Sequence, residues 1–121
     1  MIKVSKYIVI SGIVLIIAVG IIHWLDARDA LQEAVYKGWL FYANGVGSAL
    51  AAYGILRGRR WGWFLGVFIA VASIAGYVAS RTIGLPLIPP EPHDWFEPLG
   101  VASLITEGLF IVLFMKMNRE K

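Results

Sequence analysis

The sequence predicts an all-α membrane protein in which four transmembrane helices form an antiparallel bundle with both termini in the cytoplasm. The 121 residues are 59% hydrophobic and only 16% charged, and the mean hydropathy is +0.72. A soluble domain of this length has no core large enough to bury so much apolar surface. Four apolar stretches are long enough to cross a bilayer, and the basic residues gather on one side of them. The length allows a single domain, residues 1–121.

Each predicted span is uncharged or nearly so over roughly 17–20 residues, which matches a hydrocarbon core of about 30 Å at 1.5 Å per residue. Segments in lipid must satisfy their own backbone hydrogen bonds, so we expect helices. Strands are disfavoured because no stretch alternates cleanly and alanine and glycine are frequent. The predicted spans are Tyr7–Leu25, Gly38–Leu56, Trp61–Ser80 and Leu99–Met115.

The charges that flank the spans predict their orientation. Eight of the eleven basic residues fall on the side of the termini, namely Lys3, Lys6, Arg57, Arg59, Arg60, Lys116, Arg119 and Lys121. The other side holds Arg28, Lys37 and Arg81, together with most of the acids. The positive-inside rule therefore places both termini in the cytoplasm, as a multi-pass protein of the cell (plasma) membrane. The tryptophans lie at predicted span ends, as in an aromatic belt: Trp24, Trp39, Trp61, Trp63 and Trp95.

The three connections differ in kind. Arg57–Arg60 is nearly the shortest possible link, so the second and third spans must form a tight hairpin. The segment Asp26–Lys37 is a longer polar connection with room for a short interfacial helix. The segment Arg81–Pro98 contains all five prolines, which favour extended polyproline geometry. This stiff segment either caps the outer end of the bundle or acts as a rigid spacer.

Small residues predict how the helices pack, because helices in lipid associate through close contact of small side chains. The second span carries Ala43, Gly47 and Ala51 at four-residue steps, and the third span carries Gly62, Gly66 and Ala70. We expect these two stripes to face each other within the hairpin; the alternative is a dimer interface. The first span is bulky all round, so we expect it to face lipid or a partner protein.

Glu107 is the strongest pointer to a functional interior. A carboxylate near the bilayer midplane costs a few kcal/mol or more unless it is paired, protonated or facing water. One hypothesis is a neutral carboxyl that locks the packing by a hydrogen bond to Asn44 or to a tyrosine. The alternatives are proton or cation handling and ligand binding.

Three other polar residues join Glu107 in a candidate polar interior. Asn44 lies about two turns below the outer interface and Arg81 at the outer end of the third span. For Asn44 an interhelical hydrogen bond is favoured over ligand binding, and for Arg81 a pairing with loop acids or a lipid phosphate. His23 is expected near the outer interface, snorkelling to water.

The ligand types for a metal site are present but poorly arranged. His23, His93, Asp94 and Glu97 fall on one side of the membrane, yet the last three lie in the proline-rich segment, where no helix fixes their spacing. We expect no metal and no cofactor. There is no cysteine, no phosphate-binding loop and no nucleophile triad, which argues against an enzyme. The basic residues form no groove or arm for nucleic acid.

One set of motifs resembles a known group of proteins. The set comprises Ile22-His23, Glu33-Ala34-x-Tyr36-x-Gly38, Arg57-Gly58 before Trp61-Gly62-Trp63, Ser80-Arg81-Thr82-Ile83-Gly84-Leu85-Pro86, and Trp95-x-Glu97-Pro98-Leu99-Gly100 followed by Glu107. It resembles small four-span membrane proteins of archaea and actinobacteria that carry a Ser-Arg-Thr-x-Gly-Leu-Pro segment. The group has no assigned function, so the resemblance implies an architecture and not an activity.

Two classes of function follow. The favoured hypothesis is a non-enzymatic accessory or structural subunit that packs against other membrane proteins or against copies of itself in the lipid bilayer. The alternative is a protein that binds or transports a small molecule, an ion or a proton through an outward-facing polar pocket around Glu107. A cavity in the outer half of the bundle that reaches toward Glu107 would favour the alternative.

Overall fold

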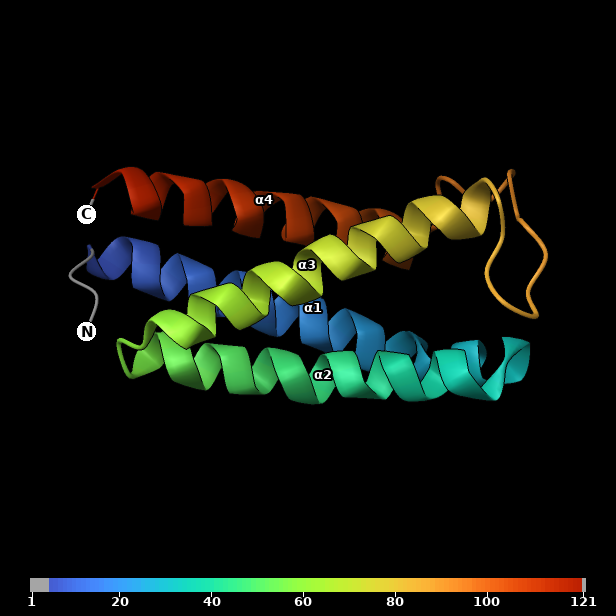
Figure 1. Cartoon of the computed structure of the whole chain (residues 1–121), viewed down its shortest axis with the longest axis horizontal. Helices are drawn as coiled ribbons and strands as arrows, with labels where there is room; N and C mark the ends of the chain where they lie inside the picture. Colours follow the sequence, from blue (N-terminus) through green and yellow to red (C-terminus); the bar gives the residue numbers. More distant parts are fainter. Residues whose placement is uncertain (1–4, 121) are drawn as a thin grey trace.

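The computed structural model describes residues 5–120, which form four α-helices (Figure 1). They are α1 (Lys6–Glu33), α2 (Val35–Leu56), α3 (Arg60–Arg81) and α4 (Pro98–Glu120). The prediction of an all-helical fold is confirmed for this part of the chain. Consecutive helices alternate in direction, so α1 begins and α4 ends at the same end of the molecule (Figure 1). Lys3 and Lys121, two of the residues used for orientation, lie outside the described residues.

Three helices are long and apolar enough to cross a membrane: α1, α3 and α4 as far as Arg119. The second helix, α2, has 22 residues but is not among them. Its sequence mixes apolar residues with glycines, aromatic hydroxyls and Asn44, which lower its hydropathy. The length and apolar character that a membrane span requires are therefore found for three of the four predicted spans.

The first helix is longer than predicted, because most of the expected polar connection after Leu25 is helical. α1 continues to Glu33 and is separated from α2 by the extended residue Ala34 alone. The helix persists because Ala27 and Ala30 continue its buried face, with exposed fractions of 0% and 2%. Gly38 permits the sharp reversal, since a Cβ there would collide with Leu31.

The closest contacts between helices occur at small residues, as predicted, but only some of them join the predicted partners. Gly62 of α3 lies against the α2 backbone at Gly54 and Ile55, and Gly47 of α2 faces Ile69 of α3. Gly66, however, faces the ring of Phe110 on α4. Gly62 therefore packs against α2 as expected, Gly47 contacts α3 through Ile69, which is not part of the predicted stripe, and Gly66 contacts α4 instead.

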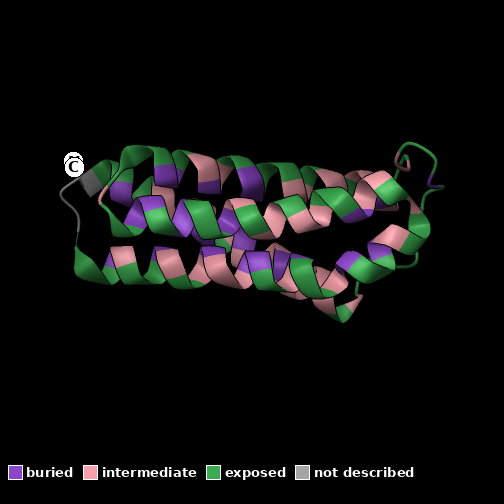
Figure 2. Cartoon of the chain, turned by 90° about the horizontal axis from the view of Figure 1, so that it is seen from below, coloured by how far each residue is buried: buried purple, intermediate pink, exposed green. Residues whose placement is uncertain are grey.

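The first helix makes the most extensive contact in the bundle, with α2, and also packs against α4. A Cβ on Gly20 would meet Ser48, and a Cβ on Gly45 would meet Trp24. Along each helix, buried positions alternate with exposed ones, so that every helix keeps an outward apolar side (Figure 2). The glycines and alanines of α1 form a packing face that its bulky isoleucines conceal in the sequence, whereas Ile10, Val14 and Ile21 remain exposed. The expectation that α1 faces lipid or a partner protein over much of its surface stays a prediction.

Trp63 is a core residue and not part of an aromatic belt. It is 1% exposed, and its ring stacks on Phe110 with the centroids 5.5 Å apart. The small residue Gly12 of α1 makes room for it. The other four tryptophans are exposed by 36–65%, as the belt prediction requires.

The proline-rich segment caps one end of the bundle. Leu85 and Ile88 form an isolated antiparallel bridge, and Ile88 is buried. The segment is tied to α3, since the Tyr77 hydroxyl donates to the carbonyl of Trp95 at 2.6 Å and the Glu91 amide donates to the carbonyl of Ser80 at 2.9 Å. Of the two alternatives for this segment, the structure therefore has the cap.

Candidate functional site

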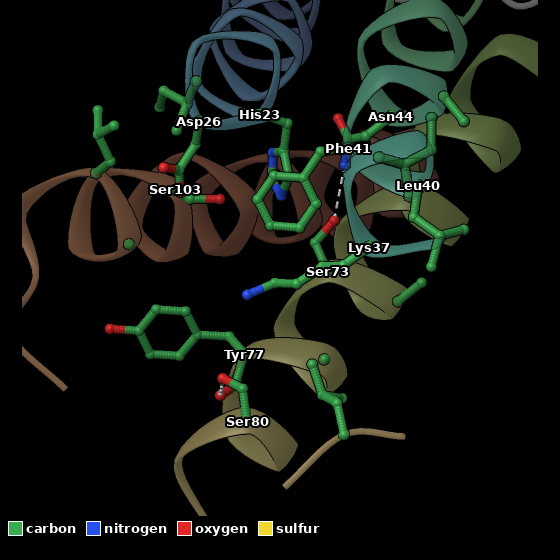
Figure 3. A pocket seen from close by; sticks show the side chains of 18 of the residues that line it. His23, Asp26, Lys37, Leu40, Phe41, Asn44, Ser73, Tyr77, Ser80 and Ser103 are labelled. Atoms are coloured by element: carbon green, nitrogen blue, oxygen red, sulfur yellow. Dashed lines mark hydrogen bonds between the residues drawn. The ribbon is translucent and has the colours of Figure 1, made fainter. Parts of the chain in front are cut away.

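A cavity of about 590 Å³ lies at the capped end of the molecule. All four helices and the loop between α3 and α4 contribute to its lining (Figure 3). His23 comes from α1, Asn44 from α2, Ser73 from α3 and Ser103 from α4. The cavity is large enough for a small organic molecule.

The inner end of the cavity is called its floor here. On the α2–α3 side of this floor, polar side chains are hydrogen-bonded to one another. The Asn44 amide donates to the Ser73 hydroxyl at 2.9 Å (Figure 3). The Ser48 hydroxyl donates to the Asn44 carbonyl oxygen at 3.2 Å. Asn44 is thus an interhelical hydrogen-bonding residue, as its favoured interpretation predicts, and it also lines the cavity.

Glu107 lies behind the floor, where it is 1% exposed and pairs with groups from two helices. The Ser103 hydroxyl donates to its Oε2 at 2.5 Å. The Nε2 atom of His23, on α1, lies 3.8 Å from the same oxygen. The expected hydrogen bond from Glu107 to Asn44 or to a tyrosine is therefore wrong, because Ser103 and His23 are the partners of the carboxyl group. Asn44 is instead bonded to Ser73 and Ser48.

His23 is buried and does not snorkel to water. Its exposed fraction is 9%, its Nδ1 lies 2.9 Å from the carbonyl oxygen of Val19, and its ring meets Phe41 edge-on. The expectation of an interfacial histidine is wrong because α1 does not end at Leu25. The helix continues for two more turns, which places His23 inside the bundle.

The mouth of the cavity is acidic. Its lining contains six carboxyl side chains and two basic ones: Asp26, Asp29, Glu33, Glu91, Asp94 and Glu97, with Lys37 and Arg81. Partial burial raises the pKa of Glu91, and the neighbouring carboxylates of Glu33 and Asp94 raise it further. The charged form of Glu91 is therefore disfavoured, an effect that a bound cation relieves.

Both basic residues of the lining are already engaged. The ammonium of Lys37 pairs with Glu33 one turn earlier. The guanidinium of Arg81 lies over the ring of Tyr77, 3.9 Å from its centroid, and donates to the Asp94 carbonyl oxygen at 3.2 Å. The prediction that Arg81 pairs with a loop acid is therefore wrong in detail, because a backbone carbonyl takes the place of a carboxylate. Arg81 fastens the loop to α3.

One wall of the cavity is apolar and reaches the outer surface of the bundle. Leu40 of α2 and Phe68 of α3 line it, although they are 61% and 70% exposed. The cavity therefore also meets the surface between α2 and α3. On the capped side, the Tyr36 hydroxyl donates to the carbonyl of Pro86 at 2.6 Å and joins the start of α2 to the loop.

The four predicted site residues have different places in this arrangement. His23 and Glu107 face each other, Asn44 lies across the floor, and Arg81 lies at the rim. The weak metal candidates are not assembled, because the described residues contain no group of three His, Asp or Glu side chains able to hold a metal ion. Sequence reasoning missed Ser73, which lies one turn from the cavity-lining Ile69 and Tyr77. Its position on the α2-facing side of α3 was the available signal.

Comparisons with protein-family models, with curated proteins and with solved structures found no match.

Proposed function

We propose that this protein is a membrane protein that binds a small amphipathic cation in the cavity. The observation that carries the proposal is the lining of the 590 Å³ cavity, where six carboxyl groups face two basic groups that are both engaged. An organic cation supplies the charge that this mouth lacks, and its apolar part fits the wall at Leu40 and Phe68.

We also propose that all four helices cross the cell membrane, with both termini in the cytoplasm. The 22 residues of α2 cover about 33 Å at 1.5 Å per residue, enough to cross the hydrocarbon core. The turn at Arg57–Arg60 is basic and the opposite end is acidic, which supports this orientation. In this arrangement the cavity opens outward and sideways toward the outer leaflet.

The orientation predicts a labelling pattern, and the absence of native cysteine makes the measurement clean. In intact cells, a cysteine introduced at exposed His93 should react with an impermeant maleimide added outside. A cysteine at exposed Arg59 should react only after the membrane is opened. Labelling of Arg59→Cys and protection of His93→Cys in intact cells would reverse the orientation.

Binding predicts that cations stabilise the purified protein. Tetraalkylammonium chlorides, from tetramethyl to tetrabutyl, should raise the detergent melting temperature at matched ionic strength, whereas alkylsulfonates of similar size should not. A site occupied at a hundredfold excess over Kd gains about 2.7 kcal/mol. Thermal unfolding followed by circular dichroism measures the shift.

A matched pair of glycine variants tests whether the cavity is the binding site. A Cβ at Gly76 or at Gly108 meets no atom within 4 Å, but only Gly76 lines the cavity. Gly76→Leu should therefore abolish the response to cations, and Gly108→Leu should retain it. An accessory subunit without a ligand, the competing hypothesis, predicts no cation response in either variant or in the parent protein.

A further inference from the structure

We infer that His23 and Glu107 together hold one proton and release it when a cation occupies the cavity, so that the site exchanges a cation for a proton. The inference rests on the proposed function and adds that cation binding is coupled to the release of a proton. It is carried by the geometry of the pair and by its place directly behind the cavity floor.

The hydrogen bond to Val19 fixes the tautomer of His23. A carbonyl oxygen only accepts, so Nδ1 of His23, 2.9 Å away, must carry a proton. The other ring nitrogen, Nε2, faces Glu107 Oε2 at 3.8 Å. Nε2 therefore either presents a lone pair to the carboxyl group or carries a second proton toward it.

The number of shared protons follows from the net charge. With one proton, the pair is either an imidazole beside a carboxylic acid or an imidazolium beside a carboxylate, and both forms have zero net charge. With no proton the pair carries one negative charge, and with two it carries one positive charge. A side chain that is 1% exposed makes either net charge costly, so the neutral state with one proton is favoured. The two groups then titrate as a unit.

A cation bound in the cavity can interact electrostatically with this pair. His23 and Ser103 line the cavity and Glu107 does not, so the carboxyl group lies one side chain behind the floor. A cation held by the acids of the mouth, of which Asp26 lies one turn of α1 from His23, stabilises the negatively charged state of the pair across a medium of low dielectric constant. The N–H or O–H bond of the shared proton then breaks, and the proton leaves through cavity water to bulk water. One positive charge enters and one leaves.

The charged side chains of the cavity lining do not already provide the positive charge that the cation would bring to the pair. On α1, the nearest further titratable groups of the lining are Asp26 and Asp29, which are acids. On α2 the basic group is Lys37, which pairs with Glu33. On α3 it is Arg81, which is bonded to Ser80 and to the loop carbonyl of Asp94. The loop contributes acids, and α4 contributes Glu107 itself.

Calorimetry measures the exchange directly. The best-binding tetraalkylammonium ion is titrated into the purified protein in buffers of different ionisation enthalpy, which gives the number of protons released per cation. We expect about one proton released from the parent protein, and almost none from Glu107→Gln or from His23→Asn. His93→Asn is the matched control, because His93 is exposed and lies outside the cavity lining; it should release as many protons as the parent protein.

The outcomes separate the two proposals. Cation binding by the parent protein without proton release overturns the exchange and leaves the binding function standing. Absence of binding by every tetraalkylammonium ion overturns the binding function and the exchange with it. Proton release that persists in both Glu107→Gln and His23→Asn assigns the proton to the acids of the mouth and overturns the role of the pair. If one of these variants fails to fold, the other still tests the pair, because proton release equal to that of His93→Asn would assign the proton to the mouth.

Discussion

Gly62→Leu is expected to cause the largest loss of stability of any glycine replacement in the bundle. A Cβ at this position would lie 2.5 Å from the amide nitrogen of Ile55, 2.6 Å from the carbonyl carbon of Gly54 and 2.8 Å from the carbonyl oxygen of Ala51. All three atoms belong to the backbone of α2, which cannot move aside as a side chain can. Overpacking typically costs about 1–3 kcal/mol, and we expect this variant at or above the upper end.

The glycines of the bundle form a graded series that tests the same explanation. At Gly66 a Cβ would meet the ring of Phe110 at 2.5 Å, and at Gly47 it would meet the Ile69 side chain at 3.1 Å. Side chains yield more easily than backbone, so detergent melting temperatures of the leucine variants should fall most for Gly62, less for Gly66 and least for Gly47. Gly108→Leu, with no atom near its Cβ, should leave the melting temperature near that of the parent protein. Equal melting temperatures across the series would mean that these glycines do not set the helix spacing.

Helix identity was predictable from the sequence, whereas helix ends and packing partners were only partly so. Apolar length and the positions of charges are local properties, and they predicted four helices close to their observed centres. The end of α1 was placed at Leu25 because polar residues follow it, yet a helix needs only one buried face to continue. Ala27 and Ala30 supply that face, and this pattern was present in the sequence but outweighed by the charges.

The site was predictable in its residues but not in its geometry. Glu107 and Asn44 stand out because polar groups are rare in apolar spans, and His23 stands out as one of only two histidines. The contact between His23 and Glu107 depends on the length of α1 and on the packing of α1 against α4, which no local pattern specifies. The cavity is harder still to predict, because empty volume is what remains after all four helices and the loop have packed.

Glu107→Gln is expected to leave the fold nearly unchanged, whereas Glu107→Leu should destabilise it. Glutamine has the same shape, and with its amide nitrogen in the place of Oε2 it can donate both to the Ser103 hydroxyl oxygen and to Nε2 of His23. Leucine leaves the buried Ser103 hydroxyl and the His23 ring without their partner, and an unsatisfied buried polar group costs about 1–3 kcal/mol. Detergent melting temperatures measure both effects.

A double variant shows whether the loss of stability in Glu107→Leu arises from the contact between Glu107 and His23. If the loss in Glu107→Leu arises from leaving His23 unpartnered, then adding His23→Leu should cost less than the sum of the two single changes. His93→Leu is the control, because that exposed side chain should add its own effect independently. Simple additivity of His23→Leu and Glu107→Leu would mean that the two side chains do not interact.

The pH dependence of stability then distinguishes a shared proton from a purely structural contact. Stability changes with pH only where the folded and unfolded states bind different numbers of protons, and Glu107→Gln removes one of the two groups that share the proton. The difference in melting temperature between the parent protein and Glu107→Gln should therefore vary with pH between about pH 5 and about pH 9. The same measurement on His93→Asn, a change at an exposed side chain outside the cavity lining, is the control. A constant difference for Glu107→Gln would mean that the pair binds the same number of protons in both states, and the carboxyl group would then act only as a hydrogen-bonding link between α1 and α4.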